Sequence, residues 1–380
     1  MRIALFSEAF APQVNGVVRT QTELVRYLCR RGHQVLQAVP YCKANPRSEN
    51  VVEFRAVPFP LYPEMPFILP HWRFHRREFE KVEAFKPDLV HLMSPGVLAY
   101  FGQLWARRHG CLVVASYETD IIRYMHYYGF GRFEPQLWRY LRWLFNNCHH
   151  TYVPSQVTKD QLIKGGIRDV RVFERGVDNV LFHPGKRSEA VRESLGVEPG
   201  GALVLYAGRL SKEKNLAVLL RAFMRLAGEH PQARLVVTGD GPHRRALVRS
   251  IGRSPGITFT SWKRGEELAA LFASADVFAL PSSTETLSLV SLESMASGVP
   301  VLAMNAGGVR DIVEHERTGL LANSVQEFEW GLRRLVEDIP LRTRLGLNGR
   351  RYAEDKTWSH AFESLERNYL EALAGRHESG

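Results

Sequence analysis

Cysteine is scarce in this sequence, with four residues in 380. These cysteines lack the close spacing of zinc ligands, and they stand at positions Cys29, Cys42, Cys111 and Cys148. Such spacing also argues against the disulfide framework on which small extracellular domains depend. We therefore expect reduced thiols and a cytoplasmic protein.

Long apolar runs are absent as well. No stretch reaches the roughly 18 residues that span a bilayer. Ser7 and Glu8 interrupt the N-terminal sequence MRIALFSEAF after a short apolar run, so it predicts a first strand rather than a signal peptide. The expected location is the cytoplasm, with a peripheral position at the inner membrane face as an extension of that prediction.

The glycine-rich fingerprint of nicotinamide cofactors is also missing. The loop after the first strand lacks Gly-x-Gly-x-x-Gly, and the segment from Gly239 to Arg244 lacks the third glycine. The sequence also lacks an Asp-x-Asp motif in a strand context, the pattern that would indicate a bound metal. We expect neither a cofactor nor a metal ion.

The composition is that of a folded α/β protein. Hydrophobic residues make up 45% and charged residues 24% of the chain, as in ordinary globular proteins. Short apolar runs such as 203–207 and 275–280 are typical of buried parallel strands. The length predicts two domains, a first over 1–184 and a second over 201–357, joined by a polar linker over 185–200.

Residues 281–308, PSSTETLSLVSLESMASGVPVLAMNAGG, carry two carboxylates after one of these strands. Seven residues separate Glu285 from Glu293. If Glu285 lies in the loop and a helix begins near Ser288, the carboxylates lie about two turns apart and could touch one ligand. The loop amides would then point from a helix N-terminus, where phosphate oxygens are stabilised. Both glutamates could instead be solvated residues of a surface helix.

Two cations follow another predicted strand. The segment GRLSKEKN, residues 208–215, comes directly after the apolar run 203–207 and contains Arg209 and Lys214. Arginine offers a planar two-pronged donor and lysine a point charge, and both suit a diphosphate. Ordinary surface cations are the alternative.

These segments, with the turn from Gly239 to Pro242, resemble the donor-binding half of retaining glycosyltransferases of family 4. The resemblance covers nearly the whole chain and is nearest to the mannosyl and sulfoquinovosyl transferase subgroup. It implies the GT-B fold, two Rossmann-like domains that face a central cleft, with a nucleotide sugar as co-substrate. It also implies that the last helix, within 358–380, crosses back to the first domain.

The same resemblance implies roles for individual residues. Arg209 and Lys214 would hold the donor diphosphate and stabilise it as a leaving group, and Glu285 would hold the sugar. Relatives usually have Phe-Gly where this chain has Leu287-Ser288, and a side chain at position 288 limits how closely phosphate approaches the backbone. The predicted donor-binding residues are Gly16, Asp120, Gly208, Arg209, Lys214, Gly239, Thr260, Lys263, Glu285, Thr286, Leu287, Ser288, Leu289 and Glu293.

A further difference from the subgroup lies in the segment SYETD, residues 116–120, where relatives have a histidine in place of Glu118. A carboxylate there could stabilise an oxocarbenium-like transition state or attack the anomeric carbon. The predicted catalytic residues are therefore Glu118, Glu285, Arg209 and Lys214. A shifted donor preference, or loss of activity, would account for Glu118 equally well.

Positive charge gathers in the first half of the chain. Residues 1–183 contain 24 Lys and Arg against 16 Asp and Glu, and the remainder contains 26 against 24. Basic and aromatic residues alternate in 73–77 and 127–145, as at an anionic membrane surface. Core aromatics beneath a solvated charged face are the plainer explanation. No nucleic-acid-binding motif accompanies them, so we expect no nucleic-acid partner.

Together with the resemblance, these patterns predict a metal-independent, retaining hexosyltransferase. It would move a hexose from a UDP- or GDP-linked donor to a lipid-linked or saccharide acceptor. Two alternatives use the same fold: a nucleotide-sugar epimerase, which needs no acceptor, and a nucleotide-sugar-binding protein without transferase activity.

Overall fold

The structure is a computed structural model that describes residues 1–45, 48–59, 62–69, 71–252, 254 and 256–377. The chain divides into two compact units. Unit 1 comprises Met1–Met125, Gly129–Glu174 and Ser359–Gly380, and unit 2 comprises His126–Tyr128 and Arg175–Trp358. Each unit is built around its own sheet and its own buried apolar cluster.

Unit 1 contains a seven-stranded sheet whose strands are all parallel. Its central strands consist of residues buried on both faces, as expected for a parallel sheet covered by helices. The strand order is β3 (Val51–Phe54), β2 (Gln34–Pro40), β1 (Arg2–Phe6), β6 (Leu89–Leu92), β7 (Leu112–Ser116), β8 (His150–Val153) and β9 (Val170–Val172).

Helices connect these strands. Asn15 begins the first of them because its side-chain oxygen accepts a hydrogen bond from the Val18 amide at 2.9 Å.

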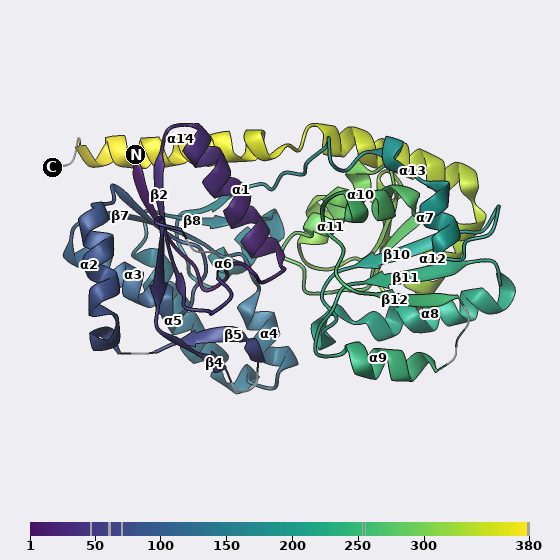
Figure 1. The fold of residues 1–380 in the computed structure, drawn as a ribbon, viewed down its shortest axis with the longest axis horizontal. Coiled ribbons are helices and arrows are strands. Elements are labelled where there is room, and N and C mark those ends of the chain that lie inside the picture. The colour runs from purple at the N-terminus through teal and green to yellow at the C-terminus, as the bar shows by residue number, and fades with distance from the viewer. Residues whose placement is uncertain (46–47, 60–61, 70, 253, 255, 378–380) are drawn as a thin grey trace. The chain divides into compact units, whose positions relative to one another are not determined.

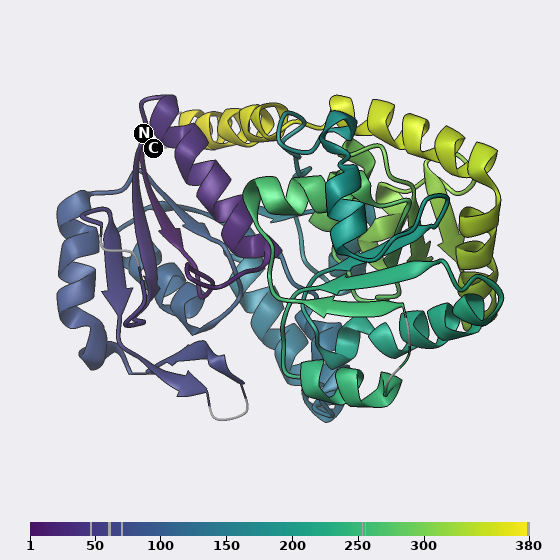
Figure 2. The same ribbon diagram turned by 45° about the vertical axis from the view of Figure 1, so that its right-hand side comes forward.

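A separate antiparallel ribbon of β4 (Ala56–Phe59) and β5 (Tyr62–Ile68) also belongs to unit 1 (Figure 2). The helices are α1 (Gly16–Arg30), α2 (Arg76–Phe85), α3 (Val97–Arg108), α4 (Ile121–Tyr127), α5 (Glu134–Asn146), α6 (Gln156–Lys164) and α14 (Trp358–His377), with short η1 (Trp72–His75) and η2 (Gly131–Phe133).

Unit 2 contains a six-stranded parallel sheet. Its order is β12 (Ile257–Thr260), β11 (Arg234–Thr238), β10 (Leu203–Ala207), β13 (Val277–Leu280), β14 (Val301–Met304) and β15 (Gly319–Ala322). Figure 1 shows α10 (Gly265–Ser274) and α11 (Leu289–Ala296) on one face, and α8 (Leu216–Glu229) and α9 (Arg244–Ile251) on the other. The remaining helices are η3 (Pro184–Lys186), α7 (Glu189–Ser194), η4 (Lys212–Lys214), η5 (Gly307–Asp311), α12 (Val325–Glu337) and α13 (Ile339–Glu354).

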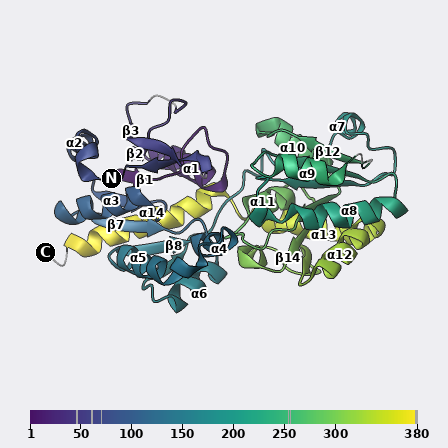
Figure 3. The same cartoon turned by 90° about the horizontal axis from the view of Figure 1, so that it is seen from below.

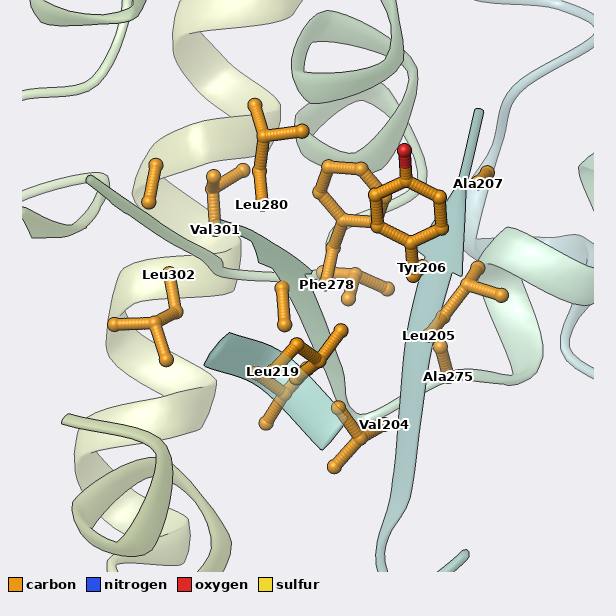
Figure 4. Packing of buried hydrophobic residues seen from close by; sticks show 14 of the residues in the cluster. Val204, Leu205, Tyr206, Ala207, Leu219, Ala275, Phe278, Leu280, Val301 and Leu302 are labelled. Carbon is orange, nitrogen blue, oxygen red and sulfur yellow. The ribbon is translucent and has the colours of Figure 1, made fainter. Parts of the chain in front are cut away.

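The core of unit 2 includes every residue of β10 and β13. Tyr206 of β10 and Phe278 of β13 both belong to this core (Figure 4), and each is at most 1% exposed. Burying a side chain of this size contributes about 1.5–3 kcal/mol to folding. The Tyr206 hydroxyl also donates a hydrogen bond to the Arg209 carbonyl at 2.9 Å. The core thereby fixes the backbone of a predicted site residue.

Residues 185–200, for which the sequence predicts a linker, lie within unit 2 and carry α7. A buried ion pair holds this helix, since Arg192 Nη1 lies 2.8 Å from Asp276 Oδ2. The same Asp276 oxygen accepts a hydrogen bond from the Leu203 amide at 2.7 Å, at the first residue of β10. The charge pair therefore joins α7 to the sheet.

Each sheet has one point at which the strand order changes direction. In unit 1 this point lies between β1 and β6, and in unit 2 it lies between β10 and β13. Loops that leave such a point diverge to opposite faces of the sheet, so ligands bind at the carboxyl ends of these strands. A ligand-binding site is therefore expected at the loops after β1, β6, β10 and β13.

Candidate functional site

The switch point of unit 2 brings two predicted residues into direct contact. Lys214, at the end of η4 after β10, places Nζ 2.7 Å from Oε1 of Glu285, in the loop after β13. Both side chains are largely shielded, with 17% and 14% exposed respectively. A cation and a carboxylate thus meet at the position where a bound ligand is expected.

Glycines allow the backbones of the loops around this switch point to approach one another closely. A Cβ atom at Gly239 would lie 2.0 Å from the Gly208 carbonyl oxygen, and one at Gly307 would lie 2.2 Å from the Glu285 carbonyl oxygen. Both positions have positive φ, so glycine is required for conformation as well as for space. The Gly308 amide donates a hydrogen bond to that Glu285 carbonyl at 2.8 Å. The backbone that carries Glu285 is therefore fixed by the loop after β14.

The segment after Glu285 leads into α11. Ser288 is its N-cap, with Oγ accepting a hydrogen bond from the Ser291 amide at 3.3 Å. Its backbone has φ 107° and ψ 84°, a region that favours glycine. Leu287 and Ser288 are each 7% exposed, and Glu293, on α11, is 2% exposed. These residues are set in the protein interior, close in sequence to the Lys214–Glu285 pair.

Thr260, the last residue of β12, and Lys263, just after it, lie at the edge of the sheet. The Thr260 carbonyl accepts a hydrogen bond from Arg244 Nη1 at 3.0 Å, and the same guanidinium donates to the Gly239 carbonyl at 3.3 Å. Lys263 is paired with Glu267 at 3.4 Å, in a solvent-exposed contact worth little energy. Arg244 was not among the predicted site residues, although it joins two of the predicted loops.

The remaining predicted residues lie in unit 1. Glu118 follows β7 and is 9% exposed. The Asp120 carboxylate accepts hydrogen bonds from Tyr117 Oη at 3.3 Å, the Arg123 amide at 3.2 Å and Gln161 Nε2 at 3.2 Å, so it caps α4. Gly16 is the exposed first residue of α1.

Two acidic residues at these strand ends were missed by the sequence analysis. Glu8 lies at the switch point of unit 1, where it accepts hydrogen bonds from Ser94 Oγ and, at 2.7 Å, from the Leu98 amide. Burial raises the pKa of the Glu8 carboxyl. Glu213, fully buried, accepts a hydrogen bond from Ser211 Oγ and precedes Lys214 directly. An acid just past an apolar strand was the available signal for Glu8.

Two other features are absent from the described part of the chain, a cluster of metal ligands and a membrane-spanning helix. Among these residues, no group of three or more His, Cys, Asp or Glu side chains could hold a metal ion. No helix that the structure describes combines the length and the apolar character that crossing a membrane requires.

Two Rossmann-like parallel sheets, with their ligand-binding loops at the strand ends, define the GT-B class of glycosyltransferases. Residues 14–180 match the family described as "Glycosyltransferase Family 4", and residues 187–352 match "Glycosyl transferases group 1". The chain belongs to glycosyltransferase family 4. It is therefore a hexosyltransferase that uses a nucleotide sugar and belongs to a family of retaining enzymes.

Individual relatives carry more specific names. The chain is 36% identical to a GDP-mannose-dependent alpha-mannosyltransferase of Mycobacterium tuberculosis (strain CDC 1551 / Oshkosh), over 99% of this chain and 98% of the relative. It is 33% identical to the sulfoquinovosyl transferase SQD2 of Arabidopsis thaliana, over 98% and 74%. It is 28% identical to an alpha-monoglucosyldiacylglycerol synthase of Streptococcus pneumoniae (strain ATCC BAA-255 / R6), over 84% and 75%.

A solved structure supports the fold. A sucrose-phosphate synthase from Thermosynechococcus elongatus superposes with a TM-score of 0.83, over 98% of this chain and 99% of that one. Its sequence identity is 21%, so this similarity concerns the fold alone.

Proposed function

We propose that the protein transfers mannose from GDP-mannose to a lipid acceptor, without a metal ion and with retention at the anomeric carbon. The names of the mannosyltransferase and diacylglycerol-modifying relatives support the choice of donor and acceptor. The observation that carries the proposal is the Lys214–Glu285 contact at 2.7 Å. A nucleotide sugar that fills this point meets a cation suited to phosphate and a carboxylate suited to sugar hydroxyls.

The donor-site residues of unit 2 have different roles in binding the nucleotide sugar and in stabilising the leaving group. Arg209 and Lys214 would bind the diphosphate, and Glu285 would accept hydrogen bonds from the sugar. As the bond from the anomeric carbon to phosphate breaks, negative charge grows on the diphosphate, and fixed cations and amides stabilise it without reorganisation. Glu293 would bind the nucleotide ribose, as part of the same loop and helix.

Glu118 has a separate role in the proposal. As the leaving group departs, positive charge develops on the sugar, and a carboxylate stabilises that charge. Glu118 is 9% exposed, and its shielded position keeps such an interaction strong. Glu118→Gln keeps the shape and removes the charge, so we expect a large loss of kcat. Normal turnover by this variant would remove Glu118 from the catalytic set.

The donor is tested by nucleotide release. The protein is incubated with GDP-mannose, UDP-glucose and ADP-glucose, and free nucleotide is measured for the wild type and for Glu285→Gln. The matched control is Glu314→Gln, a change at a side chain that is 49% exposed and pairs with Arg317. We expect slow GDP release that Glu285→Gln abolishes and the control leaves unchanged. Tight binding without release, even with acceptors added, would favour a binding protein.

A surface of unit 1 supports a membrane-embedded acceptor. On α3, Tyr100 and Leu104 are 40% and 36% exposed, and Arg107 and Arg108 follow within the next turn. The Tyr100 ring lies 5.2 Å from that of Trp143 on α5. α3 contains no acidic residue. Exposed rings and aliphatic groups beside cations match the interface of an anionic bilayer, where each basic residue contributes about 1 kcal/mol.

Vesicle sedimentation tests this surface. We expect the protein to bind vesicles that contain phosphatidylglycerol and not those of phosphatidylcholine alone. The double variant Tyr100→Ser/Leu104→Ser should bind at least tenfold more weakly. Leu347→Ser on α13 removes a side chain that is 58% exposed, in a groove that also contains Arg344 and Arg351, and provides the control. Equal losses of vesicle binding for both variants would contradict a specific membrane-binding face on α3. The GDP-release assay tests the donor independently of this result.

A further inference from the structure

A histidine in the sheet of unit 1 is held at both ring nitrogens. His91, on β6, is fully buried, with Nδ1 2.6 Å from Tyr369 Oη and Nε2 2.8 Å from Ser116 Oγ. Ser116 and Tyr369 are fully buried too. Because buried polar groups cost about 1–3 kcal/mol each when left without a partner, the three side chains fix one another. An apolar residue at position 91 would have avoided this cost.

Ser116 stands at the base of the loop that carries Glu118. It is the last residue of β7, two positions before Glu118. The far end of the loop is held as well, because Asp120 caps α4 and accepts the Tyr117 hydroxyl at 3.3 Å. The Tyr117 amide donates a hydrogen bond to the Tyr152 carbonyl at 2.9 Å. Only Glu118 and Thr119 lie between the two fixed ends.

The third partner of His91 comes from the end of the chain. Tyr369 belongs to α14, which lies along the sheet of unit 1 (Figure 3). The Tyr369 ring centroid is 6.4 Å from that of Tyr152 on β8. One turn earlier, Glu366 accepts the Tyr27 hydroxyl at 2.8 Å and lies 2.7 Å from His33 Nε2. These contacts hold α14 to unit 1, so Tyr369 offers His91 a fixed point.

We propose that His91 is a positioning residue that sets the β7–α4 loop and thereby the place of Glu118. The inference rests on the role proposed above for Glu118. His91 itself touches neither substrate nor product. It acts by holding Ser116 against α14, and a displacement of about 1 Å in a reacting group costs up to about 100-fold in rate.

The test separates positioning from stability. The variants are His91→Leu, which loses both contacts; His91→Gln, whose amide can still reach one hydroxyl; and Ser116→Ala, which is mild enough to fold if the others do not. The readouts are kcat for GDP release, the Kd of GDP and the free energy of unfolding. We expect His91→Leu and Ser116→Ala to lower kcat at least tenfold while the Kd of GDP stays within twofold of the wild-type value. His91→Gln should recover part of the lost kcat. Lower stability with unchanged kcat would overturn the inference.

A second arm asks whether His91 acts through Glu118. In the Glu118→Gln background, His91→Leu should lower kcat no further, because residues that act through one another are not additive. Independent, multiplying effects would overturn the inference while leaving the role of Glu118 intact. Normal turnover by Glu118→Gln alone would refute that role and this inference together. If the wild type released no GDP from GDP-mannose, the proposed donor would be refuted instead.

Discussion

Replacing Lys214 by methionine removes one cation from the switch point of unit 2 and preserves most of the side chain's volume. Its partner Glu285 is 14% exposed, so water cannot fully replace the lost contact at 2.7 Å. Charge-assisted hydrogen bonds of this kind contribute about 1.5–3 kcal/mol, and we expect the free energy of unfolding to fall by about 2 kcal/mol. In the reaction, a donor aimed at the developing charge contributes about 3 kcal/mol, which predicts a loss of about 100-fold in kcat/KM.

The assay measures GDP release and urea unfolding on the same preparations. Lys212→Met is the matched control, because Lys212 also belongs to η4 but is exposed. We expect the control to retain wild-type activity and stability. In the double variant Lys214→Met/Glu285→Gln, the stability loss should be smaller than the sum of the two single losses, since the residues are in contact. A kcat/KM for Lys214→Met within threefold of the wild type would refute the assignment of Lys214 to the diphosphate.

Three further predictions concern stability, each measured by urea unfolding. Ser288→Gly relieves a backbone strain of about 1–3 kcal/mol at φ 107°. The greater entropy of the unfolded glycine chain, about 0.4–1 kcal/mol, and a small loss of helix capping offset part of this. We therefore expect the free energy of unfolding to rise by about 1 kcal/mol, and a fall of that size would contradict the argument. Arg192→Met leaves buried Asp276 short of a partner and should cost about 3 kcal/mol, whereas Arg187→Met, at a side chain 41% exposed, should cost under about 1 kcal/mol; equal effects would refute the argument. Because burial raises the pKa of Glu8 above 4.5, its protonated form favours folding, and that contribution is lost as the pH rises from 4.5 through the folded pKa. Glu8→Gln should flatten this decline, and an unchanged pH profile would contradict the assignment.

Local patterns predicted the elements around the site well. The apolar run 203–207 is β10 residue for residue. The run 275–280 gives β13 from Val277, and the Asp276 side chain forms the ion pair with Arg192. The helix expected near Ser288 begins at Leu289, with Ser288 as its cap. Apolar runs and capping residues are local features of the chain, and the sequence displays them directly.

Contacts between distant residues could not be predicted in the same way. Asp276 and the Arg192 that joins α7 to the sheet are 84 residues apart, and nothing near residues 185–200 indicates this pairing. The hydrogen bonds that hold the Glu8 carboxylate come from Ser94 and Leu98, which lie 86 and 90 residues away. The sequence placed Asp120 in the donor site, and the structure shows its carboxylate engaged by Tyr117, Arg123 and Gln161. Whether it also meets the donor stays a prediction.

The anomeric configuration of the product tests the proposed reaction most directly. The protein is incubated with isotopically labelled GDP-mannose and vesicles of phosphatidylglycerol and diacylglycerol, and the extracted lipid is examined by NMR. We expect an α-mannosyl lipid from the wild type and none from Glu285→Gln. A β-mannosyl product, or a glycolipid formed only from a UDP-sugar, would contradict the proposal.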